Sequence, residues 1–268
     1  MRLNKKQYYG GSQTLLQQRN IAMVLKNINQ KGPISKRKIV NNIGISFAKV
    51  NSIILSLIER GIILEIGKEE SNGGRPSALF KINPNYRFII GCKLSHTQLR
   101  TVASNINGEI FKDDFQTFDF SLGKKYIVNS IINSIHNIID QLGDSRDKIL
   151  GIGVSVSGLV NPKTGSICHF PYLADCGDWS IEEIIEREFG LFCYVENIAN
   201  AAALAELNFG IGRGIDNFLY LNVGTGLGLG IIINGKLYEG VTGSAGEFGH
   251  IMIDENGPLC ECGNTGCL

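Results

Sequence analysis

Hydrophobic residues recur at helical spacing along the first sixty residues of the chain. Gly32-Pro33 ends the first such series, and Ser35 and Ser46 begin the next two. The third series keeps its apolar residues on one helix face, namely Val50, Ile53, Ile54, Leu57 and Ile58. Two strand-like stretches follow at residues 62–66 and 77–82, separated by a glycine-containing turn. This pattern predicts a winged helix-turn-helix domain over residues 1–82.

The pattern changes at Asn83-Pro84-Asn85, where proline favours an extended backbone. Beyond this point strands and helices alternate, and two hairpins, near residues 88–111 and 218–233, each begin a similar order of elements. We therefore predict a duplicated α/β domain with a cleft between its lobes. Residues 83–196 form the first lobe and residues 197–268 form the start of the second.

The second hairpin contains the glycine run Gly224-Thr225-Gly226-Leu227-Gly228-Leu229-Gly230. Glycine-rich turns whose N–H groups face a cleft can hold phosphate. Tight packing explains such glycines equally well. The run is not a dinucleotide fingerprint, because it lies between two strands instead of opening a helix.

Charge divides the chain at the same boundary. Residues 1–82 hold 14 Lys and Arg against 4 Asp and Glu, whereas residues 83–268 hold 12 against 21. A small, strongly basic domain favours nucleic acid as its partner. The residues that we expect to contact DNA lie on the third helix and in the wing turn: Ser46, Lys49, Asn51, Ser52 and Arg75. The alternative is a winged helix that serves only as a protein contact.

A dense group of metal-type ligands occurs near the C-terminal end of the sequence: His250, Cys260, Cys262 and Cys267. One imidazole and three thiolates are typical of a tetrahedral zinc site. Because four protein ligands leave no open position, a structural zinc is favoured over a catalytic one. Disulfides are the other interpretation. No signal segment and no apolar run of ~18 residues is present, so we predict a cytoplasmic protein that keeps its thiols reduced and spans no membrane.

Several motifs occur in a fixed order behind the wing sequence G-G-R-P: S-G-L-V-N-P, E-N-I-A-N-A-A-A-L-A-E, V-G-T-G-L-G-L-G, G-E-F-G-H and C-E-C-G-N-T-G-C. Together they resemble the ROK family of bacterial repressors and sugar kinases over essentially the whole chain. The resemblance implies an actin-like, hexokinase-type (ribonuclease H-like) fold and a sugar bound between the lobes. It also implies homodimers or dimers of dimers that leave their operators when the sugar signal changes.

The resemblance further implies roles for single residues. The positions that match sugar contacts are Gly158, Asn197, Glu247 and His250, and His250 is also a zinc ligand. Gly224, Thr225 and Gly226 are then the remnant of a phosphate-binding loop.

Two departures from the family kinases argue against phosphoryl transfer. In those kinases an Asp follows the Asn that matches Asn197 and acts as the general base, whereas here the position is Ile198. Their first strand ends in an Asp-x-Gly-Gly-Thr turn that helps to hold ATP, whereas here the sequence is Cys92-Lys93-Leu94-Ser95-His96-Thr97. Lys93 still permits a bound sugar phosphate. We therefore expect no kinase activity.

Family members continue well beyond the position of Cys267, with helices that complete the second lobe. We therefore expect an incomplete second lobe in this sequence, whether it is a fragment or a natural short form. Apolar surface meant for those helices is then exposed, and we expect low solubility.

These inferences predict a sugar-responsive transcriptional repressor that binds operator DNA in the nucleoid and has no kinase activity. The effector is a sugar or a sugar phosphate. One alternative is an active ROK sugar kinase, of the glucokinase or fructokinase type, with an attached DNA-binding head. Another is a defunct regulator produced by truncation, for which loss of operator binding is the sign.

Overall fold

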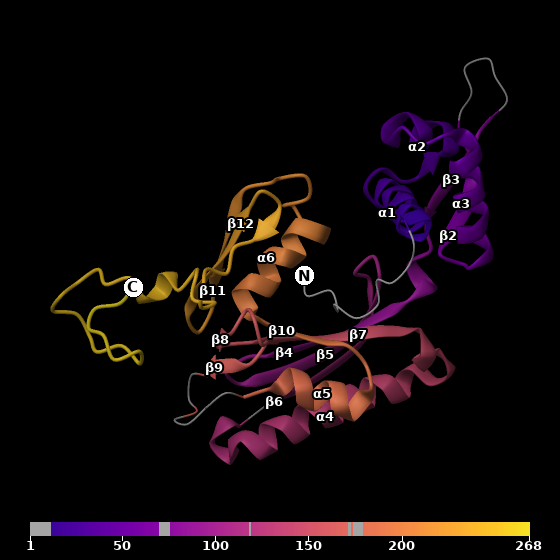
Figure 1. The fold of residues 1–268 in the computed structure, drawn as a ribbon. Helices are drawn as coiled ribbons and strands as arrows, with labels where there is room; N and C mark the ends of the chain where they lie inside the picture. Colours follow the sequence, from indigo (N-terminus) through magenta and orange to yellow (C-terminus); the bar gives the residue numbers. More distant parts are fainter. Residues whose placement is uncertain (1–11, 70–75, 118, 171–172, 174–178) are drawn as a thin grey trace. The chain divides into compact units, whose positions relative to one another are not determined.

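The computed structural model describes residues 12–69, 76–117, 119–170, 173 and 179–268. The chain divides into two compact units, Met1–Tyr86 and Arg87–Leu268 (Figure 1). This division falls close to the change in sequence pattern at Asn83-Pro84-Asn85. The finer ranges of the two lobes stay predictions.

The N-terminal unit contains three helices and a three-stranded antiparallel sheet of order β1-β3-β2. Its elements are α1 (Ser12–Lys31), β1 (Ile34–Ser35), α2 (Lys36–Ile43), α3 (Phe47–Glu59), β2 (Ile63–Lys68), β3 (Ala78–Ile82) and the short 3-10 helix η1 (Pro84–Tyr86). The helices and β3 pack on one core because each contributes fully buried apolar side chains: Val24, Ile28, Ile39, Val50, Ile54, Leu57 and Phe80. Periodicity did not reveal β1, since it has only two residues and is defined by its pairing with β3.

The larger unit contains a mixed five-stranded sheet of order β10-β7-β4-β5-β6. Strands β4, β7 and β10 run parallel, and β4, β5 and β6 form an antiparallel meander. The elements of this part are β4 (Phe88–Leu94), β5 (Gln98–Asn105), β6 (Ile110–Thr117), η2 (Phe120–Leu122), α4 (Gly123–Leu142), η3 (Gly143–Lys148), β7 (Ile149–Val156), β8 (Leu159–Val160), β9 (Ile167–His169), α5 (Ile181–Phe189) and β10 (Cys193–Asn197).

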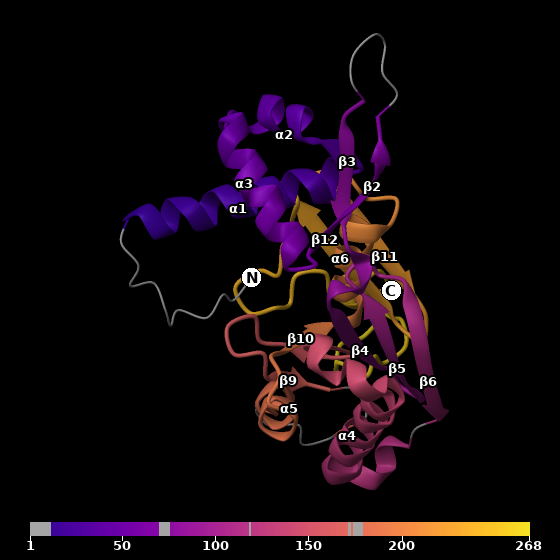
Figure 2. The same cartoon turned by 90° about the vertical axis from the view of Figure 1, so that its right-hand side faces the viewer.

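Helices α4 and α5 cover one face of this sheet (Figures 1 and 2). Alternation along β4 explains which side chains they cover. Ile90, Cys92 and Leu94 are buried in the core, whereas Lys93 lies on the opposite, open face.

A second antiparallel sheet follows, and α6 (Ile198–Phe209) packs on it. Its strands are β11 (Phe218–Val223), β12 (Leu227–Ile233) and β13 (Lys236–Leu237), and the turn η4 (Phe248–His250) comes later. In the described part of the larger unit, the two meanders that hairpin patterning predicted are therefore present. The first is extended by β7 and β10.

The glycine run on β11 and β12 has two different parts. A Cβ at Gly230 would lie 2.5 Å from the Ala203 Cβ and 2.6 Å from the Ala199 carbonyl oxygen, so this glycine lets α6 approach the sheet. A Cβ at Gly224 or Gly226 would meet no atom within 4 Å. Packing therefore accounts for the end of the run and not for its beginning.

The face of β11 turned away from α6 is apolar and exposed. Register places Tyr220 opposite Gly230, so the alternate side chains Leu219, Leu221 and Val223 point to the other face. Val223 is 72% exposed. This surface agrees with the apolar exposure expected from the sequence, and low solubility stays a prediction. None of the helices in the described ranges is both long and apolar enough to cross a membrane.

The three predicted serine caps have different outcomes. Ser46 caps α3, because its hydroxyl accepts a hydrogen bond from the Lys49 amide at 3.4 Å. Ser35 makes no capping bond, so that cap is wrong; its backbone pairs with Leu79 in the sheet, which turns the hydroxyl into the interior. The sequence Ser180-x-x-Glu183 also predicts a capping box at the start of α5, and this is wrong, because Ser180 makes no capping hydrogen bond and its ψ of 69° is far from the extended geometry that caps require.

Candidate functional site

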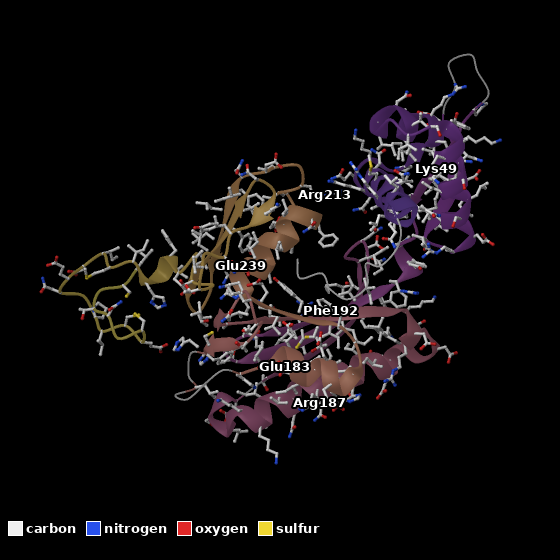
Figure 3. All side chains as sticks on the ribbon, in the orientation of Figure 1. Lys49, Glu183, Arg187, Phe192, Arg213 and Glu239 are labelled. Atoms are coloured by element: carbon white, nitrogen blue, oxygen red, sulfur yellow. The ribbon has the colours of Figure 1, made fainter. Side chains whose placement is uncertain are left out.

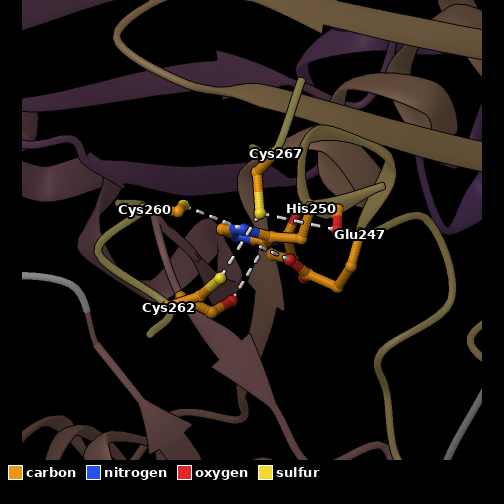
Figure 4. A network of polar contacts seen from close by, with 7 residues as sticks. Glu247, His250, Cys260, Cys262 and Cys267 are labelled. Carbon is orange, nitrogen blue, oxygen red and sulfur yellow. Dashed lines mark hydrogen bonds and ion pairs between the residues drawn. The ribbon is translucent and has the colours of Figure 1, made fainter. Parts of the chain in front are cut away.

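The four predicted metal ligands meet at one place in the structure. His250, at the end of η4, and the three cysteines after it bring their ligand atoms within 4.8 Å of one another (Figure 4). The cysteines are Cys260, Cys262 and Cys267, and all three are free thiols. The sequence spacing therefore translates into a compact cluster of one nitrogen and three sulfurs.

The distances within this cluster fit a tetrahedral metal site. Cys262 Sγ lies 3.7 Å from Cys267 Sγ, and Cys260 Sγ lies 3.6 Å from His250 Nδ1. Around a zinc ion with Zn–S of about 2.3 Å and Zn–N of about 2.0 Å, tetrahedral angles give ~3.8 Å between sulfurs and ~3.5 Å between sulfur and nitrogen. The donor set and its spacing are therefore compatible with zinc.

Tight backbone turns hold the ligands in place. The Cys260 amide donates to the Asn264 carbonyl at 2.8 Å, and the Gly266 amide donates to the Pro258 carbonyl at 2.8 Å. Gly266 has φ of +68°, and a Cβ there would overlap the Asp254 carbonyl oxygen. Only glycine fits this position, which directly precedes the last ligand. The Asn264 amide also lowers the pKa of the Cys262 thiol by donating to its sulfur.

His250 presents its two ring nitrogens to different partners. Nδ1 faces the sulfur of Cys260, whereas Nε2 lies 3.8 Å from Oε2 of Glu247 (Figure 4). This arrangement suits a neutral imidazole that offers the Nδ1 lone pair to a metal and keeps a proton on Nε2. Glu247 and His250 are therefore neighbours, and both side chains are about half exposed.

Asn197 and Gly158, the other predicted sugar positions, also meet. Asn197 Nδ2 donates to the Gly158 carbonyl at 2.9 Å, and Oδ1 accepts from the amides of Ala199 and Asn200 at the start of α6. A Cβ at Gly158 would lie 2.5 Å from the His169 carbonyl oxygen, so this position requires glycine. Most of the carboxamide of Asn197 is thus used within the protein, and one Nδ2 hydrogen is left for a ligand.

The two pairs belong to segments that touch each other. Gly243, on the loop that leads to Glu247, lies against the Val160 carbonyl oxygen, where a Cβ would come within 2.1 Å. Val160 follows Gly158 by two residues in the same loop and strand. The close approach therefore connects the loop carrying Glu247 and His250 with the loop carrying Gly158.

A hollow of about 400 Å³ lies on the open face of the five-stranded sheet. Lys93, Ser155 and Glu196 are among the residues that line it. Glu196 is only 5% exposed, and its carboxylate accepts hydrogen bonds from the Tyr194 hydroxyl, the Asn197 amide and the Asn200 side chain. Sequence reasoning missed Glu196 and Tyr194, because a carboxylate within a strand gives no signal of its partners.

The predicted DNA-contacting residues divide into three groups. Lys49 and Ser52 are exposed on α3, and Ser46 is exposed at its N-cap (Figure 3 labels Lys49). Asn51 is partly buried and accepts a hydrogen bond from Lys36, a residue that the sequence reasoning did not single out. Arg75 lies outside the described residues.

Comparison with known proteins places the chain in a family. Residues 90–268 match the family model described as "ROK family". The chain therefore belongs to the ROK family, and its larger unit has the actin-like ROK fold with a mixed sheet.

The chain is similar to proteins described as repressors. It is 35% identical over 258 residues to the "Putative xylose repressor" of Caldicellulosiruptor sp. (strain Rt8B.4), which covers 96% of this chain and 64% of that protein. It is 30% identical over 258 residues to the "DNA-binding transcriptional dual regulator NagC" of Escherichia coli (strain K12), with 96% and 63% covered. The chain thus spans less than two thirds of the length of these relatives.

A solved structure supports the same grouping across both units. The "ROK family transcriptional regulator, homolog of E.coli MLC protein" superimposes with a TM-score of 0.76 at 28% sequence identity. The superposition covers 94% of this chain and 63% of the other.

Proposed function

We propose that this protein is a sugar-responsive transcriptional repressor whose ROK unit senses a sugar and carries out no phosphoryl transfer. The observation that carries the proposal is the combination of two features in one chain. A strongly basic unit of three helices and an antiparallel sheet precedes a ROK unit in which Ile198 stands at the position of the kinase base. The similarity to a xylose repressor and to a transcriptional regulator supports the same function.

In this proposal the N-terminal unit is a winged helix-turn-helix, with α3 as the recognition helix. Its exposed polar residues include Lys49 and Ser52, and the exposed Ser46 precedes it as the N-cap. Arg75 belongs to the wing turn predicted from the sequence. Two copies of the unit in a homodimer would occupy two half-sites of an operator.

The effector is a sugar held where the loops of Gly158 and Glu247 approach each other. Glu247 and the Nε2–H of His250 supply an acceptor and a donor at one end, and the remaining Nδ2 hydrogen of Asn197 supplies a donor at the other. Hydroxyl groups both donate and accept, so such a set suits a polyhydroxylated ligand. One relative is described as a xylose repressor and another as the dual regulator NagC. The sugar is therefore to be identified by screening several classes of sugar.

Zinc, when bound, would hold the segment of residues 250–267 together by its charge and coordination. Its ligands would be His250, Cys260, Cys262 and Cys267. With all four positions filled by protein, it has no place for a reacting water. An imidazole ring held through Nδ1 would keep Nε2 directed at Glu247.

The absence of phosphoryl transfer rests on the residues at the start of α6. Ile198 has no group that accepts a proton, and the adjacent carboxylate of Glu196 is buried and already accepts hydrogen bonds from three partners. Glu196 therefore does not substitute for the missing base. Lys93 on the open sheet face replaces an acidic residue that the family kinases use with ATP.

Two measurements test the proposal. Binding of the chain to duplex DNA should weaken steeply with salt, and Lys49→Ala should reduce the salt slope by about one. Arg187→Ala, which removes an equal charge from the exposed face of α5 (Figure 3), is the matched control and should leave DNA affinity unchanged.

The second measurement is a thermal-shift panel of pentoses, hexoses, amino sugars and their phosphates. At least one sugar should raise the unfolding temperature of the wild type and fail to do so in Glu247→Gln. If no sugar stabilises the protein, the sensor proposal is wrong; if a sugar drives ATP consumption, the kinase alternative replaces it.

A further inference from the structure

Lys36 on α2 is hydrogen-bonded to Asn51 on α3, one of the residues that the sequence predicts to contact DNA. Lys36 Nζ donates to Asn51 Oδ1 at 2.8 Å, and the same ammonium lies 5.3 Å from the centre of the Phe80 ring. Lys36 and Asn51 are both partly buried, and Phe80 is 1% exposed. The contact therefore joins both helices of the helix-turn-helix to the sheet behind them.

This contact determines which way the Asn51 carboxamide points. An ammonium group has three donors and no acceptor, so the amide atom beside it must be the oxygen and not the nitrogen. Nδ2 occupies the other branch of the same planar group and is directed away from Lys36. No acceptor among the described residues contacts Nδ2. Its two hydrogens are consequently available to a partner.

The neighbours of Asn51 on α3 place it at the surface proposed to contact DNA. Lys49 and Ser52 flank it and are exposed, while Val50 and Ile53 face the core. Asn51 thus lies at the border between the buried and the outward face of the helix, where its amide is anchored on one side and open on the other.

The position of Lys36 is unfavourable for the helix that carries it. Lys36 is the first residue of α2, where the positive end of the helix dipole disfavours a cation. The hydrogen bond to Asn51 and the aromatic face of Phe80 offset this effect. The contacts of this lysine are therefore made to α3 and to the sheet.

We propose that Lys36 is a positioning residue that makes Asn51 a donor-only reader of DNA. Asparagine usually recognises adenine by accepting from N6 with its oxygen while donating to N7. Here the oxygen is held beside a cation whose own N–H groups repel another donor. Two N–H donors suit guanine, which presents the adjacent acceptors N7 and O6, so Asn51 favours guanine over adenine at the base pair it contacts. The inference rests on the proposed DNA-binding function.

The test is selection of bound sequences from a randomised duplex library by the whole chain, followed by affinity measurement on single-base variants. The contacted position is the one whose preference disappears in Asn51→Ala. Wild type should prefer guanine over adenine there by roughly 3- to 10-fold, the size of one or two hydrogen bonds. Lys36→Met, which keeps length and apolar packing on Phe80 but removes the donor, should shift that preference toward adenine. All other positions of the site should stay unchanged.

Two further variants separate orientation from charge. Arg37→Met removes a neighbouring exposed cation of α2 and should weaken binding to all sequences equally, without changing the base preference. Lys36→Arg keeps a donor to Oδ1 and should retain guanine. Asn51→Asp replaces the donors by acceptors and should turn the preference toward cytosine, whose N4 donates.

The outcomes distinguish this inference from the function on which it rests. If wild type selects no DNA sequence, the proposed repressor function fails. If it selects a site with adenine at the contacted position, or if Lys36→Met lowers affinity uniformly as Arg37→Met does, the positioning role is wrong. Should Lys36→Met fail to fold, the base that the wild type prefers decides: guanine at the contacted position supports the inference, and adenine overturns it. A contact to phosphate would appear as a uniform loss in Asn51→Ala.

Discussion

The carboxamide of Asn197 joins the start of α6 to the carbonyl group of Gly158. Nδ2 donates to that carbonyl at 2.9 Å, while Oδ1 caps the helix by accepting from the amides of Ala199 and Asn200. One side chain therefore ties α6 to the loop beside the proposed sugar site. Helix position and loop position are coupled through it.

Replacing Asn197 separates these two tasks. Asn197→Ala should destabilise the protein by about 1–2 kcal/mol, because the cap is lost and the Gly158 carbonyl loses its partner. Asn197→Ser keeps a capping oxygen and should recover most of that stability in urea unfolding. Neither variant should show the thermal shift with sugar. Sugar binding by Asn197→Ser as tight as wild type would show that the loop contact is unimportant for sensing.

The two ends of the glycine run should respond differently to substitution by alanine. Gly230→Ala should lower the free energy of unfolding by about 1–3 kcal/mol, because the new methyl group overlaps Ala203 and the Ala199 backbone. Gly224→Ala, with no atom within 4 Å of the new Cβ, should change stability by less than ~0.5 kcal/mol. Equal losses in the two variants would contradict the division of the run into packing and open parts.

The cysteine cluster predicts one bound metal ion per chain. Purified protein should contain one equivalent of zinc by elemental analysis, and Cys262→Ser should lose it together with thermal stability. Cys168→Ser is the matched control, since this thiol lies outside the cluster and should not affect metal content. Glu247→Gln should keep the metal while losing the sugar response. Retention of full zinc by Cys262→Ser would exclude the four-ligand site.

We expect that the missing base at Ile198 is not the only obstacle to kinase activity. Wild type should consume no ATP with any sugar. Ile198→Asp should remain inactive, because the strand end Cys92–Thr97 still lacks the carboxylate and glycines of the family kinases. Coupled measurement of ADP release over the sugar panel checks both expectations. Sugar-dependent turnover by the wild type would revive the kinase alternative.

Burial predicts which cysteines resist alkylation. Desolvation raises the pKa of Cys92 to about 12, so the folded state disfavours its thiolate. The thiol should therefore stay unlabelled at pH 9 in the folded protein and react in urea. Because the folded pKa lies above the unfolded one, this group stabilises the fold at neutral pH, and its contribution declines as pH rises above about 9. Labelling followed by mass spectrometry shows the order in which the thiols react. In metal-free protein, modification of Cys92 before any thiol of the cluster would contradict the prediction.

The sequence alone determined the features that depend on local pattern and residue chemistry. Helical spacing identified the three N-terminal helices, and hairpin patterning identified both meanders of the larger unit. The donor set of His250 and the three cysteines needed no tertiary information, because ligands so close along the chain are brought together by their own turns. Membership of the ROK family was also present in the order of motifs.

Only the tertiary structure decided what each side chain contacts across long separations. Lys36 and Asn51 are fifteen residues apart, and Asn197 and Gly158 are thirty-nine apart, so no local pattern records their bonds. The failed caps at Ser35 and Ser180 have the same cause, since sheet pairing and backbone geometry override the preference of a serine. The two ends of the glycine run differ because α6 packs against only one of them. Periodicity reports which side of an element is buried, whereas packing between elements sets which atoms meet.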